Sequence, residues 1–297
     1  MNLSAQILDG KALAAEIRGK IKPEVDALKS AGVWPGLATL LVGENPASQV
    51  YIRSKHKACQ EVGIRSFNLT LSQSSTNAEV MRKVEDLNAD PQVHGILVQL
   101  PLPLQIDSNA VLSLIHPDKD VDGFHPQNLG RLFSAKDARD IFSAAKPIPV
   151  PCTPQGVIAL IHKTGVPIAG RNAVVVGRSV IVGKPVFSLL LAHHATVTIA
   201  HSQTPNLAAV CRDADLLVVA IGIANKITGN MVKPGAVVVD VGMNRLAAGG
   251  LCGDVDFETA KETAGWITPV PGGVGPMTIV MLLQNTLLLA KNSCVAA

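Results

Sequence analysis

Short apolar runs that alternate with amphipathic stretches constrain the fold of this chain more than any other feature. The first series consists of residues 37–42, 64–71 and 95–99, and a stretch with helical spacing separates each run from the next. Strands of a parallel sheet are buried on both faces and need a crossover helix between them, so they are apolar without alternation. The pattern predicts a β-α-β-α-β unit with a parallel sheet.

A second series of apolar runs follows in the other half of the chain. It consists of residues 173–176, 196–199, 216–220 and 236–241, again separated by stretches with helical spacing. The same reasoning predicts a second parallel sheet, so the fold class is α/β with two α/β domains.

The domain boundary is expected in a segment without sustained periodicity. Residues 118–154 are rich in Asp, Gly and Pro, and a run of alternating prolines occupies 147–151. We therefore expect a first domain over 1–148 and a second over 149–275. The last stretch, 276–297, has helical spacing and is expected to return to the first domain.

Composition excludes several classes of partner. The 26 Lys and Arg residues against 23 Asp and Glu residues give a net charge of +3, too small for a basic nucleic-acid surface. The longest apolar stretch, Met277–Ala290, is interrupted by Gln284 and Asn285 and is shorter than the roughly 20 residues that span a membrane. The five cysteines form no CxxC pair and no metal-ligand spacing, and the N-terminus lacks the pattern of a secretory signal. We expect a soluble cytoplasmic protein without a metal, a nucleic-acid partner or a membrane partner.

A helix with a Tyr-x-x-x-Lys spacing follows the first predicted strand. Asn45 is a good N-cap, Pro46 suits the first helical position and Gly63 ends the helix. Tyr51 and Lys55 are four residues apart, so they share one face and can bind a common ligand. The spacing alone favours a surface lysine beside an aromatic ring on a half-buried helix. Short-chain dehydrogenases have the same spacing after their dinucleotide domain, whereas here it comes well before one.

Gln99 follows the third predicted strand, and prolines come directly after it in Gln99-Leu100-Pro101-Leu102-Pro103. Open α/β sheets bind ligands at the carboxyl ends of their strands. An amide there can bind a heterocycle with mixed donors and acceptors, orient a lysine, or only cap the strand.

Three carboxylates lie in one turn, Asp118, Asp120 and Asp122. A carboxylate can accept two parallel hydrogen bonds from a pterin-like edge, although such clusters are also common in solvated turns. The spacing differs from that of a calcium loop.

A glycine-containing loop, 177–185, joins the first strand of the second series to a helix. Glycines and a helix N-terminus at this position suit a pyrophosphate, although the pattern departs from GxGxxG. No acid follows Thr198-Ile199, where NAD enzymes carry one for the ribose, and Arg178 and Ser202 could hold a 2′-phosphate instead. The loop therefore favours NADP over NAD.

Glycines and prolines are concentrated once more in Pro269-Val270-Pro271-Gly272-Gly273-Val274-Gly275-Pro276, before the last helix. The turn allows close backbone approach to a flat ring, or it is only a rigid connector.

These motifs, in this order and spacing from about Gly10 to Lys291, closely resemble the bifunctional methylenetetrahydrofolate dehydrogenase/methenyltetrahydrofolate cyclohydrolase family. The resemblance implies a folate-binding catalytic domain, a Rossmann-like NADP-binding domain, tetrahydrofolate substrates and a homodimer. It implies that Lys55 is the cyclohydrolase acid/base, with Tyr51 and Gln99 as orienting partners and Asp122 as the ligand of the pterin edge. The other residues expected to bind substrate are Leu100, Pro101, Pro271, Gly272 and Gly273, and those expected to bind the cofactor are Gly177, Arg178, Ser179, Gly183, Pro185, His201, Ser202, Gly222 and Gly242.

Two other functions share the β-α-β pattern. One is a two-domain NAD(P)-dependent dehydrogenase of an amino or hydroxy acid, and the other is a catalytically silent dinucleotide-binding module. Neither needs Tyr51, Lys55, Gln99 and Asp122 together.

Overall fold

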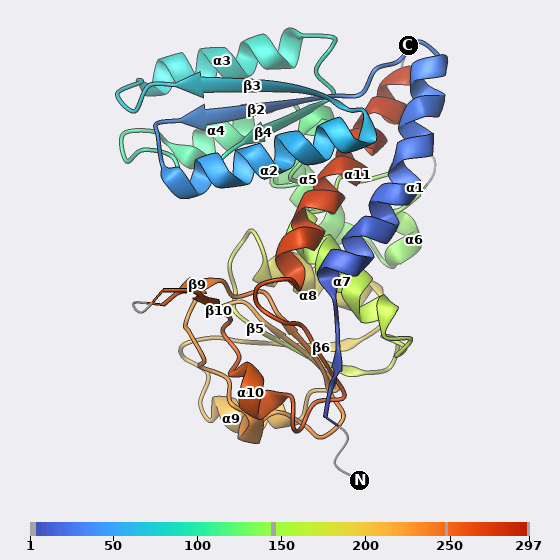
Figure 1. Ribbon diagram of the computed structural model, residues 1–297, viewed down its shortest axis with the longest axis vertical. Coiled ribbons are helices and arrows are strands. Elements are labelled where there is room, and N and C mark those ends of the chain that lie inside the picture. The colour runs from blue at the N-terminus through green and yellow to red at the C-terminus, as the bar shows by residue number, and fades with distance from the viewer. Residues whose placement is uncertain (1–3, 144–146, 247–248, 296–297) are drawn as a thin grey trace. The chain divides into compact units, whose positions relative to one another are not determined.

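The computed structural model describes residues 4–143, 147–246 and 249–295 (Figure 1). The chain forms two compact units, each of which draws on several segments of the sequence. The six-stranded unit comprises Met1–Ala15, Leu132–Ile141 and Pro151–Thr278, and the three-stranded unit comprises Glu16–Arg131, Phe142–Val150 and Ile279–Ala297.

The three-stranded unit contains the first predicted parallel sheet. Its strand order is β3-β2-β4, all pairs are parallel, and every residue of the central strand β2 is buried. The elements are β2 (Gly36–Val42), β3 (Arg65–Leu71), β4 (Gly95–Val98), α2 (Pro46–Val62), α3 (Asn77–Ala89), α4 (Ser108–Leu114) and the 3-10 turn η1 (Pro117–Lys119).

Apolar side chains of α3 and α4 cover one face of this sheet. Helix α3 begins with a capping box in which Thr76 and Glu79 satisfy each other's backbone N–H groups. Its buried residues Val80 and Val84 join Leu40 and Ile96 in one core. β2 and β4 are fully buried, as the apolar runs predict, whereas the edge strand β3 is exposed or half-buried along its whole length.

The last helix, α11 (Val274–Val295), returns to the three-stranded unit as expected. Residues 279–295 of α11 lie beside residues 16–30 of α1 (Gly10–Ser30) in Figure 1, and Lys291 forms an ion pair with Glu24. The buried Asn285 Nδ2 donates hydrogen bonds to the carbonyl oxygens of Val121 (2.9 Å) and Val150 (2.8 Å). The helix is long and apolar enough to cross a membrane by length and composition alone, but most of it is buried inside the structure.

The six-stranded unit contains the second predicted sheet. Its order is β1-β11-β8-β7-β5-β6, and all pairs are parallel. The strands are β1 (Gln6–Ile7), β5 (Asn172–Val176), β6 (Thr196–Ala200), β7 (Leu216–Val219), β8 (Val237–Asp240) and β11 (Trp266–Ile267), with β9 (Asn244–Arg245) and β10 (Leu251–Cys252) forming a separate antiparallel pair. Helix α5 (Pro126–Ser134) begins in the three-stranded unit and ends in the six-stranded one. The helical elements of the six-stranded unit are α6 (Ala138–Ile141), α7 (Cys152–Lys163), α8 (Gly183–Ala192), α9 (Leu207–Arg212), η2 (Gly229–Met231) and α10 (Phe257–Ala260).

The order of these strands reverses between β5 and β7. From β5 the chain passes to β6 on one side and then returns to β7 on the other side. Such a topological switch point leaves a crevice outside the carboxyl ends of the two strands, where open α/β sheets bind their ligands.

The first fifteen residues and residues 132–141 belong to the six-stranded unit, whereas we expected a first domain over 1–148. The reason for the N-terminal difference is β1, which pairs with β11: Gln6 lies opposite Trp266 and Ile7 opposite Ile267. A two-residue strand is too short to produce a periodic pattern in the sequence.

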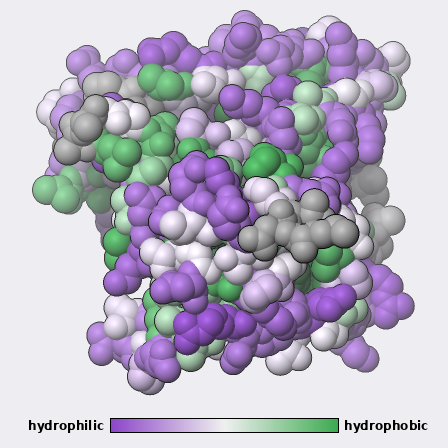
Figure 2. Space-filling model, turned by 60° about the horizontal axis from the view of Figure 1, so that its bottom comes forward, coloured by the Kyte–Doolittle hydropathy of each residue, from purple (hydrophilic) through white to green (hydrophobic). Residues whose placement is uncertain are grey.

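The chain is apolar in composition but has a mostly polar surface, because many of its apolar side chains are buried. The mean hydropathy is +0.31, yet the face in Figure 2 is mostly hydrophilic and its hydrophobic residues form separate patches. In the part of the chain that the structure describes, none of the cysteines forms a disulfide.

Candidate active site

Lys55 and Gln99 are brought together at the carboxyl end of β4. The Lys55 ammonium donates a hydrogen bond of 3.0 Å to Gln99 Oε1, and Gln99 Nε2 donates to the carbonyl oxygen of Leu100 at 2.7 Å. Both side chains are half-buried. The two bonds fix which end of the amide faces the lysine, so Gln99 orients Lys55.

Local sequence explains where α2 presents this lysine. The Asn45 side chain accepts a hydrogen bond of 3.2 Å from the backbone N–H of Ser48, and Gly63 ends the helix with φ of +83°. Tyr51 lies one helical turn before Lys55 and is 42% exposed.

Cys59 lies one turn after Lys55 and is fully buried. Burial raises the pKa of its thiol to about 12, although the charge of Lys55 acts in the opposite direction. Cys59 is therefore a protonated thiol at neutral pH and no nucleophile.

The three acids of the turn have different environments. Asp118 is exposed, whereas Asp120 is 2% exposed and accepts hydrogen bonds from the backbone of Phe124 (3.2 Å) and His125 (2.8 Å) and from Asn128 Nδ2 (2.9 Å). Burial raises the pKa of Asp120, and these hydrogen bonds act against it. Asp120 is thus a structural residue.

Asp122 lies in the turn that follows a bridge to β4. The parallel bridge pairs Asp120 with Ile96, and Asp122, two residues later, is half-buried. The Asn285 hydrogen bond to Val121 fixes the segment from the α11 side. The three-stranded unit therefore brings Lys55 and Gln99 into contact at one strand end, and it also contains the turn that carries Asp122.

The loop after β5 is built for close backbone approach. A Cβ on Gly183 would lie 2.2 Å from the carbonyl oxygen of Gly177, and one on Gly177, at φ of +124°, would lie 2.2 Å from that of Ala220. Ser179 Oγ accepts hydrogen bonds from the backbone N–H groups of Val182 (3.2 Å) and Gly183 (3.3 Å), and its proton is left to donate. Pro185 is buried in the first turn of α8.

Two polar side chains follow neighbouring strand ends. Arg178 comes after β5 and Ser202 after β6, and both are exposed. His201 is half-buried, and its Nδ1 accepts from the backbone N–H of Gln203 at 3.2 Å. The turn after β6 carries no carboxylate, as the sequence indicates.

The glycine-proline turn lies in the six-stranded unit. The backbone N–H of Lys11 donates to the carbonyl oxygen of Gly272 at 3.1 Å, and a Cβ on Gly10 would lie 1.8 Å from that of Gly273. Gly272 has φ of +113°, and Pro271 is exposed. The turn is fixed against the start of α1, which the sequence did not indicate.

Comparisons with known proteins match both halves of the chain. A family model described as the tetrahydrofolate dehydrogenase/cyclohydrolase catalytic domain matches residues 8–122, and the NAD(P)-binding domain model of the same family matches residues 151–294. The bifunctional protein FolD of Moorella thermoacetica is 55% identical over 289 residues, which are 97% of this chain and 100% of that protein.

The chain belongs to the tetrahydrofolate dehydrogenase/cyclohydrolase family.

Two solved structures of this family have nearly the same fold. The FolD methylenetetrahydrofolate dehydrogenase/cyclohydrolase of Campylobacter jejuni has a TM-score of 0.92 at 47% identity and covers 98% of this chain and 100% of that one. The Trypanosoma brucei enzyme, complexed with NADP and an inhibitor, has a TM-score of 0.91 at 40% identity and covers 98% of this chain and 99% of that one.

Sequence reasoning missed two buried carboxylates behind the predicted cofactor glycines. Asp254 is fully buried and accepts from the backbone N–H of Gly222 (2.9 Å), and Asp240 accepts from that of Gly242 (2.8 Å). The available signal was an acid in an apolar setting, Gly253-Asp254-Val255, since a buried charge needs several partners.

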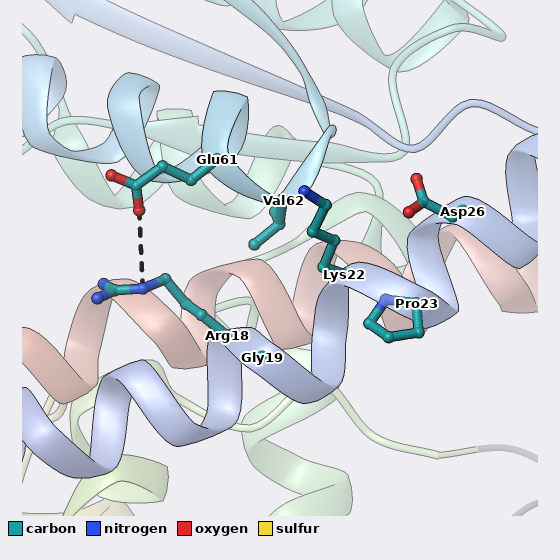
Figure 3. A pocket seen from close by; sticks show the side chains of 7 residues that line it. All are labelled: Arg18, Gly19, Lys22, Pro23, Asp26, Glu61 and Val62. Carbon is teal, nitrogen blue, oxygen red and sulfur yellow. Dashed lines mark ion pairs between the residues drawn. The ribbon is translucent and has the colours of Figure 1, made fainter.

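A hollow of about 620 Å³ in the three-stranded unit does not include the predicted family residues (Figure 3). Arg18 and Lys22 of α1 face the end of α2, and Arg18 pairs with Glu61 at 3.7 Å. Both signs of charge line this hollow, so it has no clear preference for a ligand charge.

Proposed function

We propose that this chain oxidises 5,10-methylenetetrahydrofolate to 5,10-methenyltetrahydrofolate with NADP and then hydrolyses the product to 10-formyltetrahydrofolate. The observation that carries the proposal is the hydrogen bond between Lys55 and Gln99 at the end of β4, in a chain of this family. The reaction of an amino or hydroxy acid dehydrogenase does not require Lys55, Gln99 and Asp122 together.

The residues of the six-stranded unit fit a dinucleotide. Gly177 and Gly183 hold the loop after β5 in a tight conformation beside the switch point between β5 and β7, because a Cβ on either would overlap a backbone carbonyl. Arg178 and Ser202 would hold the 2′-phosphate, and the missing carboxylate after β6 removes a repulsion from that group. When bound, NADP supplies the nicotinamide carbon that accepts the hydride. The NADP complex of the Trypanosoma brucei relative supports this choice.

The dehydrogenase step needs no side-chain base. Hydride leaves the methylene carbon between N5 and N10, and the two nitrogens share the charge of the methenyl cation that remains. The protein contributes orientation. Asp122 would accept hydrogen bonds from the pterin edge, while Gly272 and Gly273 would offer a flat backbone surface to a ring.

The cyclohydrolase step needs proton transfer. Water attacks the methenyl carbon, and opening of the five-membered ring moves a proton from oxygen to nitrogen. Lys55 would transfer this proton, because its ammonium has a fixed position against Gln99 and Tyr51 lies one helical turn away.

We further propose that the protein is a cytoplasmic homodimer. The support is the family resemblance and the open edge of the six-stranded sheet at β6, whose outward backbone groups have no partner strand in the described residues. Light scattering after gel filtration tests the dimer.

The experiment that tests the function is an absorbance assay of the purified chain. With methylenetetrahydrofolate and NADP, we expect the methenyl absorbance to appear and then decay to formyltetrahydrofolate. With methenyltetrahydrofolate alone, decay should be faster than the uncatalysed rate. Turnover of amino or hydroxy acids in place of folate would contradict the proposal.

A further inference from the structure

Asp254 is a buried carboxylate that accepts hydrogen bonds from the turn at residues 221–223 and from Asn244 of β9. Its Oδ2 accepts from the backbone N–H groups of Ile221 (2.6 Å) and Gly222 (2.9 Å). Its Oδ1 accepts from the backbone N–H of Ile223 (2.9 Å) and from Asn244 Nδ2 (2.9 Å). Three consecutive amides therefore point at one side chain that is 0% exposed.

This turn follows β7 at the switch point of the sheet. Ala220, directly before the turn, lies so close to Gly177 of the loop after β5 that only a glycine fits there. The loops after β5 and β7 are the two that flank the crevice of a switch point. Asp254 thus holds one of the two walls of the expected cofactor site.

The side of the turn opposite to Asp254 is open. Gly222 has φ of +68°, and no atom lies within 4 Å of the position a Cβ would take. The Ile223 side chain is 53% exposed. A flat ligand can approach this backbone, while the N–H groups of residues 221–223 donate to Asp254.

The position of Asp254 is itself fixed. Its backbone N–H donates to Asp240 Oδ1 at 3.0 Å, and a Cβ on Gly242 would lie 2.2 Å from Asp254 Cγ. In the described residues no cation pairs with this carboxylate, and four hydrogen-bond donors offset the cost of burying it.

We propose that Asp254 is a positioning residue for NADP: it holds residues 221–223 in the conformation that receives the cofactor, without touching the cofactor. This inference rests on the proposed function, because it assumes that the switch point binds NADP.

The test replaces Asp254 with Asn, which keeps the size but gives up the charge and one acceptor oxygen. We expect the NADP Kd, measured by calorimetry, to rise about 10- to 100-fold, the effect of losing charge-assisted hydrogen bonds. Amide hydrogen exchange of residues 221–223 should accelerate. The cyclohydrolase kcat, which needs no NADP, should stay within about twofold of wild type.

Asp215→Asn is the matched control. Asp215 accepts from the backbone N–H of Asn172 (3.0 Å) and from Lys233 (2.6 Å) in the same unit, but at the amino end of β7. Asp215→Asn should lower the Tm and leave the NADP Kd unchanged. If Asp254→Asn lowers the Tm and accelerates exchange at 221–223 but keeps the wild-type Kd, Asp254 is only structural and the inference is overturned.

Asn244→Ala keeps the inference testable if Asp254→Asn does not fold. This variant removes one of the four donors, and we expect accelerated exchange at 221–223 and a Kd raised at least about threefold. An unchanged Kd would overturn the inference. Failure of the proposed function looks different, because the wild-type protein itself would then bind no NADP.

Discussion

In the proposed mechanism, the charged amine of Lys55 transfers a proton at the end of a long methylene stem. Lys55→Met removes the charge and keeps most of the stem, so we expect a folded protein. The cyclohydrolase kcat should fall about 10²- to 10⁴-fold, and the dehydrogenase kcat should change less than about tenfold, because only hydrolysis needs a proton transfer. The two activities are measured separately by methenyl absorbance.

Lys57→Met is the control for Lys55→Met, since Lys57 is exposed on the same helix. Both of its activities should match wild type. Equal losses of both activities in Lys55→Met would argue against the role of Lys55 in proton transfer.

Arg178 is the exposed cation of the loop after β5. In Arg178→Ala, kcat/KM with NADP should fall about 10- to 100-fold, because a charge-assisted hydrogen bond to the 2′-phosphate is lost. With NAD, which lacks that phosphate, the change should be small. Arg171→Ala, at the opposite end of β5, is the control and should retain the preference. An intact NADP preference in Arg178→Ala would exclude Arg178 as the phosphate ligand.

The elements that the sequence predicted are those whose apolar runs are long enough to show a pattern. Strands β2 to β8 and helices α2 and α11 agree with their predicted ranges within a few residues. The two-residue strands β1 and β11 were missed, since their pairing joins residues 6–7 to 266–267 and no local pattern contains that information.

The site residues, like the strands and helices, were predicted only where the local sequence carries a signal. The sequence indicated Lys55 and Gln99 separately, by helix spacing and strand end, but their contact joins residues 44 positions apart. It grouped three acids in one turn, whereas burial separates Asp120 from Asp122. The role of Asp254 was not predicted, because three of its partners are backbone amides, which leave no pattern in the sequence.

Helix α11 fixes the Asp122 segment through Asn285. In Asn285→Leu, the carbonyl oxygens of Val121 and Val150 lose their donors, which should lower the free energy of unfolding by about 1–3 kcal/mol. The folate KM should rise, and the NADP Kd should stay unchanged. Gln284→Leu, which changes the exposed neighbouring residue, is the control. An unchanged folate KM in Asn285→Leu would show that α11 does not position the folate-binding residues.

At the scale of the whole molecule, Asp240 makes stability depend on pH. Burial and, to a smaller extent, the charge of Asp254 raise its pKa from 3.8 to about 6, although three backbone hydrogen bonds act in the opposite direction. A folded pKa above the unfolded one stabilises the protein below about pH 4, and this contribution is lost as the pH rises through 6. Between pH 4 and 7, wild type should lose on the order of 1–3 kcal/mol more than Asp240→Asn.

Urea unfolding at several pH values measures this difference. A Trp34→Phe background leaves Trp266 of β11 to report on the six-stranded unit. Parallel pH profiles for the two proteins would show that Asp240 does not titrate in this range.

The exchange of chain segments between the two units has a genetic consequence. A gene divided at codon 150 would separate β1 from β11 and the end of α11 from Val121, so each fragment would lack part of its own core. We therefore expect that recombination at the proline-rich junction, which exchanges one part of the chain for that of another gene, does not yield a protein that keeps one of the two activities. We expect a lineage that loses only the cyclohydrolase reaction to do so by point substitution, for example at Lys55.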